Sequence, residues 1–317
     1  RVHSLTERRM KITSLITTLA LLTTSLSFAG GEGWMHDFEA AKKKAAAENK
    51  DLLVDFTGSD WCGWCIKLNE EVFQHDPFKK GIAENYILVE LDYPRDKSKM
   101  DEATIAQNEK LQTSYAIKGF PSILLMDAQG RPYAKTGYQK GGPEAYLKHL
   151  SEIQNNKKEL GEELATARKS EGLDKAKALF AILAEMPEGH ASHYVKAEEE
   201  IIKNDPEDVT GFTAKKNQEQ AMFGLETGLQ TAMEAGKTDE ALALVDSFIT
   251  IHKVDGEKKQ EILSIKFNIL MKDNNFEAAE KLLDEIVAVD PESQYGKGAA
   301  SFKPRLEKMK VEAAEEE

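Results

Sequence analysis

Leu-Leu-Val-Asp-Phe-Thr-Gly-Ser-Asp-Trp-Cys-Gly-Trp-Cys, residues 52–65, is the stretch of sequence that decides the fold. It opens with a short apolar run over residues 52–56, which is typical of a buried central strand because it does not alternate with polar residues. Polar residues and a glycine follow at 57–60, and apolar residues at helical spacing begin at Cys65. The pattern predicts a strand, a turn and then a helix from Cys62 to Phe73.

Cys62 and Cys65 are the only two cysteines among the 317 residues. We expect Cys62 at the exposed start of the helix and Cys65 one turn further inside. The partial positive charge at a helix N-terminus stabilises a thiolate, which favours reactivity at the first cysteine. Because the Cys-x-x-Cys spacing follows a buried strand and opens a helix, it predicts a dithiol that forms a disulfide reversibly.

Three other interpretations of the pair fit the sequence less well. A zinc site would need two more ligands, and His75 lies ten residues on, across the helix. A permanent structural disulfide at this spacing closes almost no loop and so stabilises little. Two unreactive buried thiols would not need a tryptophan on either side of Cys62. The sequence therefore predicts a redox-active disulfide, with no metal and no organic cofactor; His190 and His193 are interpreted as an exposed pair rather than as metal ligands.

Further apolar runs and helical patterns surround this stretch as far as about residue 155. Strands are predicted at 86–91 and 122–126, and residues 131–136 can pair back as a hairpin after a turn. Helical patterns cover 35–49 and 99–114, and a last helix opens at Pro143. This order predicts an α/β domain with a mixed central sheet flanked by helices.

The segments Val54-Asp55-Phe56, Trp61-Cys62-Gly63-Trp64-Cys65 and Gly119-Phe120-Pro121 together resemble the thioredoxin superfamily, and most of all its exported thioredoxin-like branch. The resemblance covers about residues 34–154, and we place the domain at 30–156. It implies that Cys62 attacks, that Cys65 resolves, and that Asp55 is the buried acid beneath the pair. It also implies that Pro121 is a cis-proline facing the disulfide and that Phe120 aligns an extended substrate strand.

The residues around the cysteines support further predictions that do not depend on the resemblance. An aspartate inside an apolar strand is costly unless its pKa rises or it has a partner, although Asp55 at a strand edge could instead face water. Trp61, Gly63, Trp64 and Phe120 would form an apolar collar for a substrate segment. Trp64 stands where thioredoxin itself commonly has proline, which leaves the direction of electron flow open.

The N-terminal segment has the pattern of a secretory signal. Lys11 precedes an uncharged stretch over residues 12–26, and small residues stand at Ser27 and Ala29. We expect residues 1–29 to be a signal peptide, cleaved after Ala29, with Met10 as the initiator; the alternative is a buried N-terminal helix. The mature protein is then exported, periplasmic or secreted, with no membrane insertion after signal removal.

Residues 157–317 lack strand-length runs and are predicted to be all-α. One helical pattern of apolar residues, at offsets of three, four and seven, begins at Ala176, Ala241 and Ala279. These sets resemble a degenerate tetratricopeptide array of helical hairpins. The alternative is an ordinary helical bundle with similar helix starts.

The formal net charge of −13 argues against a nucleic-acid or anionic-membrane surface. The sequence therefore predicts an exported thiol–disulfide oxidoreductase, more a reductase or isomerase than an oxidase. Its partners would be client proteins with disulfides or thiols and a separate protein that donates or accepts electrons. Two alternatives remain: a scaffold whose helical half binds partners, and a redox sensor in which the disulfide state gates that half.

Overall fold

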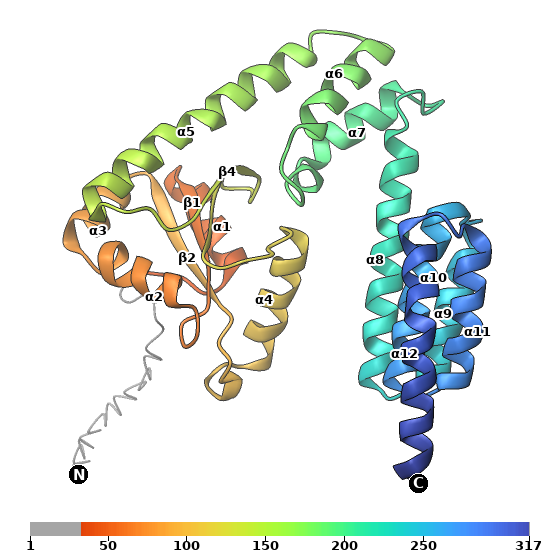
Figure 1. Cartoon of the computed structure of the whole chain (residues 1–317). Coiled ribbons are helices and arrows are strands. Elements are labelled where there is room, and N and C mark those ends of the chain that lie inside the picture. The colour runs from red at the N-terminus through yellow and green to blue at the C-terminus, as the bar shows by residue number, and fades with distance from the viewer. Residues whose placement is uncertain (1–32, 317) are drawn as a thin grey trace, which may run out of the picture. The chain divides into compact units, whose positions relative to one another are not determined.

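The computed structural model describes residues 33–316 (Figure 1). These residues form two compact units, of which the first ends at Glu200 and the second begins at Ile201. The signal peptide predicted over residues 1–29 lies outside the described residues. Within residues 33–316, no helix is both long enough and apolar enough to cross a membrane.

The first unit is built on a four-stranded mixed sheet. Its strands are β1 (Asp51–Thr57), β2 (Tyr86–Asp92), β3 (Ser122–Met126) and β4 (Pro132–Thr136), in the order β2-β1-β3-β4. β1 pairs in parallel with β2 and antiparallel with β3, and β3 forms an antiparallel hairpin with β4. β1 therefore has a neighbour on both sides, which explains why its sequence is a continuous apolar run. The predicted mixed sheet is confirmed.

Helices cover both faces of this sheet. They are α1 (Phe38–Glu48), α2 (Gly63–Leu68), α3 (Asp76–Ile82), α4 (Glu102–Ser114) and α5 (Gly142–Ala167). α2 continues as one π-helical turn, Asn69–Phe73, so the helix predicted up to Phe73 is present with a change of winding. The sequence reasoning missed α3, which is only seven residues long and begins with Asp76 and Pro77.

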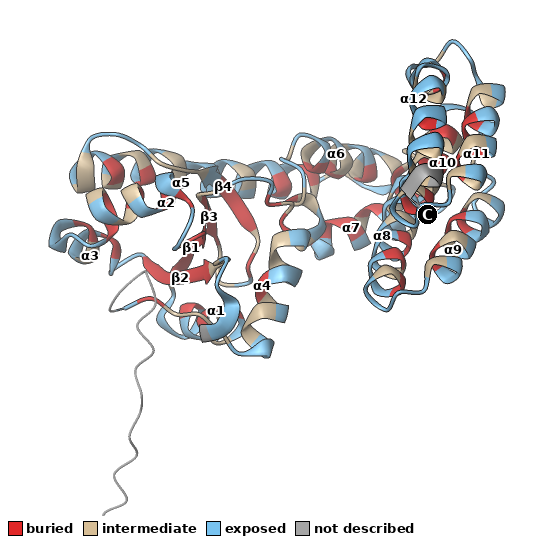
Figure 2. Cartoon of the chain, turned by 60° about the horizontal axis from the view of Figure 1, so that its bottom comes forward, coloured by how far each residue is buried: buried red, intermediate tan, exposed pale blue. Residues whose placement is uncertain are grey.

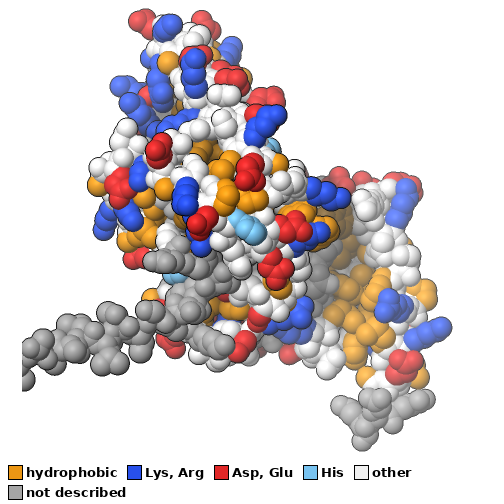
Figure 3. Space-filling view, turned by 90° about the vertical axis from the view of Figure 1, so that its left-hand side faces the viewer, with side chains coloured by type: hydrophobic (Ala, Val, Ile, Leu, Met, Phe, Trp, Pro, Cys, Tyr) orange, Lys and Arg blue, Asp and Glu red, His pale blue; other side chains and the backbone are white. Residues whose placement is uncertain are grey.

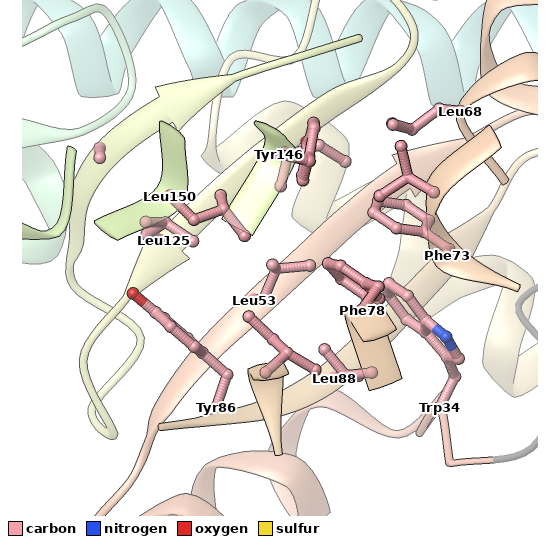
Figure 4. Close-up of a cluster of buried hydrophobic side chains, with 14 of the residues drawn as sticks. Trp34, Leu53, Leu68, Phe73, Phe78, Tyr86, Leu88, Leu125, Tyr146 and Leu150 are labelled. Atoms are coloured by element: carbon pink, nitrogen blue, oxygen red, sulfur yellow. The ribbon is translucent and has the colours of Figure 1, made fainter. Parts of the chain in front are cut away.

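Alternate residues of each strand face two separate apolar layers. On one face, Leu53, Leu88 and Leu125 pack against α2, the π-helical turn, α3 and α5 (Figure 4). On the other face, Leu52, Val54 and Phe56 pack against α1 and the end of α4. The strands are buried and the outer sides of the helices are exposed (Figure 2).

The first unit continues beyond α5 through α6 (Gly172–Ala184) into α7 (Val195–Asn204). The connection between these helices packs on the sheet domain. The hydroxyl of Tyr194 donates to the carbonyl of Pro132 at 2.9 Å, and the ring of His193 stacks on Tyr115 with centroids 3.9 Å apart. The domain division predicted between residues 156 and 157 falls inside α5 and stays a prediction.

The second unit is helical throughout its described length apart from its turns. Beyond the end of α7 it contains α8 (Phe212–Glu234), α9 (Thr238–Ile251), α10 (Gly256–Lys272), α11 (Phe276–Val289) and α12 (Gln294–Glu316). The repeated apolar sets that begin at Ala241 and Ala279 line the buried faces of α9 and α11. The set that begins at Ala176 lies instead in α6, in the first unit. The all-α prediction is confirmed, and the tetratricopeptide resemblance stays a prediction.

Candidate functional site

Cys62 and Cys65 form a disulfide at the start of α2, with their Cα atoms 5.2 Å apart. Cys62 is the N-cap residue, and its Sγ accepts a hydrogen bond from the backbone N–H of Cys65 at 3.2 Å. A backbone N–H that points at Sγ favours negative charge there once the disulfide is reduced. The geometry therefore supports Cys62 as the cysteine that forms the reactive thiolate.

Both cysteines are nearly covered in this disulfide form. Cys62 is 6% exposed and Cys65 is 4% exposed, so the exposed position expected for Cys62 is not seen. The two tryptophans beside them are open instead, with Trp61 38% and Trp64 55% exposed. The exposed surface beside the disulfide is therefore aromatic.

Trp61 is held in place from several sides. Its Nε1 donates to the carbonyl of Tyr93 at 2.7 Å, and its ring meets Phe120 edge-on with centroids 5.5 Å apart. The guanidinium of Arg95 lies 5.7 Å from the ring centroid of Trp61. A Cβ added at Gly58 would lie 2.6 Å from this indole, which explains a glycine in the turn before Cys62. Sequence reasoning found Trp61 and Phe120 but missed Tyr93.

The turn before Cys62 is tied to the segment that follows β2. The carboxylate of Asp60 accepts from the backbone N–H groups of Arg95 and Asp96 at 2.9 and 3.0 Å. These bonds lower the pKa of Asp60. Asp92 accepts from both the N–H and the hydroxyl of Ser59. The position of Cys62 therefore depends on a segment more than thirty residues away in the sequence, which sequence reasoning did not link to the site.

Trp64 lies in a second aromatic group on the other side of the motif. Its ring centroid is 5.1 Å from that of Tyr138, and the Nζ of Lys67 is 5.3 Å from both rings. The hydroxyl of Tyr138 donates to Glu71 at 2.5 Å, and this bond raises the pKa of Tyr138. Tyr138 was missed because it stands alone in a glycine-flanked loop with no local motif.

The peptide bond between Phe120 and Pro121 is cis, as the family resemblance implied. β3 begins at Ser122, opposite Phe56 of β1. Because these two strands are antiparallel, the start of β3 and the end of β1 lie at the same edge of the sheet, and the turn to Cys62 leaves from that edge. The fold thus brings Phe120 and Pro121 to the same side of the domain as the cysteine motif.

Asp55 lies in the interior and does not face water. It is 5% exposed, and within the described part of the chain its Oδ1 has no hydrogen-bond partner. Burial, and after it the charge of Asp92, raises the pKa of Asp55 to about 8. Alternation along β1 places Asp55 on the face that carries Leu53, which is the face that α2 covers. A carboxyl whose pKa is raised therefore lies under the helix that starts at the disulfide.

The two histidines interpreted as an exposed pair are covered, which corrects that expectation. His190 is 3% exposed, and burial lowers its pKa to about 4. His193 stacks on Tyr115 and contacts the carbonyl of Ser114 at 3.0 Å. Among residues 33–316, no group of three or more His, Cys, Asp or Glu side chains is placed to hold a metal ion.

The sheet topology and a disulfide at a helix start define a thioredoxin-like domain. The sequence profile of the family described as "Thioredoxin-like domain" matches residues 38–154. The fold, the Cys-x-x-Cys pair and the relatives described next support a protein-disulfide oxidoreductase.

The relatives have names from disulfide chemistry. The chain is 34% identical over 110 residues to "Disulfide bond reductase DsbH" of Chlamydia pneumoniae, and 29% identical over 104 residues to "Thioredoxin-related protein DsbJ" of the same organism. It is 32% identical over 101 residues to "Thiol:disulfide interchange protein DsbD" of Colwellia psychrerythraea. A solved structure titled "DsbH Oxidoreductase" has 31% sequence identity and a TM-score of 0.36, over 38% of this chain and 82% of that one.

These matches cover only part of each protein. They involve 35%, 33% and 31% of this chain, and 66%, 30% and 15% of DsbH, DsbJ and DsbD respectively. Each match therefore involves about a third of this chain.

Proposed function

We propose that the protein is an exported thiol–disulfide oxidoreductase that reduces or isomerises disulfides in client proteins. The observation that carries the proposal is the Cys62–Cys65 pair at the start of α2, with the backbone N–H of Cys65 directed at the Sγ of Cys62. The relatives whose names describe disulfide reduction and thiol–disulfide interchange support the same chemistry.

In the proposed reaction, the Cys62 thiolate attacks one sulfur of a client disulfide. A bond forms between Cys62 and that sulfur, the client disulfide breaks, and the other client sulfur leaves as a thiolate that takes a proton from water. Cys65 then loses its proton to Asp55 in its ionised form and attacks the sulfur of Cys62. The Cys62–Cys65 disulfide forms, the bond between Cys62 and the client sulfur breaks, and that sulfur leaves as a thiolate that takes a proton from water. Two electrons have then passed from the protein to the client.

The aromatic surface around the disulfide is proposed to receive the client. Trp61, Trp64 and Phe120 offer apolar area to an extended segment, and the backbone on either side of Pro121 would align it. Exposed aromatic rings bind unfolded or extended chains without needing a particular sequence, because their contact area is large and rigid. A Cβ added at Gly63 would meet no atom within 4 Å beyond its chain neighbours.

Reduction or isomerisation is proposed rather than oxidation because of the name of DsbH, the first relative described above. The reduction potential of the Cys62–Cys65 couple tests this directly. A potential close to the thioredoxin value of about −270 mV fits a reductase, whereas one near −120 mV fits an oxidant.

Export is proposed from the signal pattern over residues 1–29, with a separate protein that supplies electrons to the disulfide. Acidic, basic and hydrophobic side chains lie interspersed on the face shown in Figure 3. The mass of the protein recovered from the cell envelope or medium checks the cleavage after Ala29.

Reduction of insulin disulfides by the full chain, supplied with a chemical dithiol, tests the enzymatic proposal. We expect activity in the parent protein and its loss, by at least about a hundredfold, in Cys62→Ser, because the nucleophile is then absent. Activity in Cys62→Ser equal to that of the parent protein would contradict the proposal.

A further inference from the structure

Three titratable side chains follow one another in a single row across the sheet of the thioredoxin-like domain. Asp55 of β1 and Glu90 of β2 are paired residues of two parallel strands. Next to β2, residues 34–36 add a short edge segment, because Met35 forms a parallel bridge with Val89. The N–H of Met35 donates to the carbonyl of Leu88, and the N–H of Glu90 donates to the carbonyl of Met35. His36 is therefore the next residue in the row after Asp55 and Glu90.

All three members of this row lie on the same face of the sheet. Side chains alternate along a strand, and paired residues of parallel strands point to the same side. Leu53, Leu88 and Trp34, each two residues before one member of the row, belong to the apolar layer beneath α2 and α5. Asp55, Glu90 and His36 are thus directed to that layer as well.

The row leads from the interior towards solvent. Asp55 is 5% and Glu90 3% exposed, whereas the side chain of His36 is 26% exposed. The Nδ1 of His36 lies 3.9 Å from the Oε1 of Glu90 and 3.3 Å from the carbonyl oxygen of Glu90. Asp55 and Glu90 are directly paired on strands that lie about 5 Å apart, so their side chains are neighbours on this face.

The reaction proposed above needs such a path. Cys65 can give its proton only to an ionised Asp55, so this carboxyl must first lose its own proton, and Asp55 itself has almost no contact with water. A buried carboxyl whose pKa is raised holds its proton until a neighbouring group accepts it. A row of titratable groups that ends at the surface would let a proton move between the buried acid and solvent.

We propose that Glu90 and His36 are positioning residues that carry protons between Asp55 and solvent during attack by Cys65. The proposal rests on the proposed function. Asp55 releases a proton to Glu90, and Glu90 passes one to Nδ1 of His36 in the tautomer that carries its proton on Nε2. His36 then releases the Nε2 proton to water. No electrons move in this step, and each O–H or N–H bond that breaks is replaced by one on the next group.

Two further titratable groups, Asp92 and Tyr146, face the same row of side chains. Asp92, two residues beyond Glu90 on β2, raises the pKa of Asp55 and counteracts the lowering of the pKa of His36 by burial. On α5, burial raises the pKa of the Tyr146 hydroxyl, and the charge of Asp55 raises it further. Tyr146 thus remains protonated and neutral through the range in which Asp55 and His36 titrate.

The test separates the two attacks in a single turnover. Reduced protein is mixed with an aromatic disulfide that releases one coloured thiol when Cys62 attacks and a second when Cys65 attacks. In His36→Asn and Glu90→Gln we expect the second phase to slow about tenfold or more near pH 7, with the first phase unchanged, because only the second attack uses the path. Added imidazole should restore the second phase in His36→Asn.

The matched control is His75→Asn, which changes an exposed histidine of the same domain whose Nε2 contacts the carbonyl of Glu70. It should leave both phases unchanged. The proposal is overturned if His36→Asn and Glu90→Gln match the parent protein in the second phase and in its pH profile, or if both phases slow equally without rescue by imidazole. Absence of both phases in the parent protein would instead contradict the proposed function.

Discussion

At the scale of single residues, Asp55 is a buried acid whose raised pKa makes the stability of the folded protein depend on pH. Its pKa is about 8 in the folded protein and 3.8 in the unfolded chain, so the folded state binds one more proton between those values. Stability gained from this group is present below pH 4 and is lost as the pH rises through 8. Burial is the main cause, because it disfavours the charged form of the carboxyl.

We predict that Asp55→Asn flattens the pH dependence of stability between pH 4 and 8, where the parent protein loses up to about 1.4 kcal/mol per pH unit through this group. Urea unfolding of the disulfide form at a series of pH values measures it. Asp60→Asn is the contrasting control, because the pKa of Asp60 is lowered and its effect lies below pH 4. Parallel stability profiles for Asp55→Asn and the parent protein would show that Asp55 is not buried as a neutral acid.

Sequence reasoning reached the residues of the site that stand in a local motif and missed those that do not. Cys62, Cys65 and Trp61 share one short stretch, and Asp55 is conspicuous inside an apolar strand. Tyr138 and Glu90 became visible only through contacts and strand register. Glu90 could have been noticed as a second charged residue within an apolar run, but only the parallel pairing places it beside Asp55.

At the scale of elements, the connection between α6 and α7 is fitted closely against the sheet domain. Gly189 has φ of +78°, and a Cβ there would lie 2.6 Å from the backbone carbon of Tyr115. The same connection holds His193 against Tyr115 and Tyr194 against Pro132. The packing of the first unit therefore extends well beyond the last strand, which strand and helix patterns alone did not predict.

We predict that Gly189→Ala destabilises the first unit by about 2 kcal/mol or more, because it adds a backbone clash to the strain of a left-handed conformation. Thermal or urea unfolding provides the measurement. The matched control is Gly172→Ala, where φ is +50° and no atom lies within 4 Å of an added Cβ, so only the strain remains. Equal losses for the two variants would mean that the connection does not press on Tyr115.

The strands were predicted closely because each is a short apolar run bounded by turn residues. Strand β1 was expected at 52–56 and extends over Asp51–Thr57. Helix α3 escaped notice because seven residues hold only two buried side chains, Phe78 and Ile82, which is too short a pattern to recognise. The strand order was not predicted, since pairing depends on contacts between segments distant in sequence.

At the scale of the whole molecule, each unit has apolar cores of its own. The sheet domain has one layer on either face of the sheet. In the second unit, α8, α9 and α10 enclose one cluster, and α10, α11 and α12 enclose another. Separate cores allow the cysteine pair to change its redox state without repacking the helical unit.

We therefore predict that reduction of the disulfide increases hydrogen exchange near residues 57–65 and leaves exchange in α8–α12 unchanged. Mass spectrometry of the oxidised and reduced full chain provides the comparison. A change in protection across α8–α12 would favour the alternative in which the disulfide state regulates the helical unit.

The central claim is that Cys62 exchanges disulfides with other proteins, and trapping of the mixed disulfide tests it most directly. Cys65→Ser cannot resolve the intermediate, so client proteins should remain bonded to Cys62, and peptide mass analysis should locate the bond there. The double variant Cys62→Ser with Cys65→Ser should capture none. If Cys65→Ser captured no more protein through a reducible bond than the double variant does, the account would be contradicted.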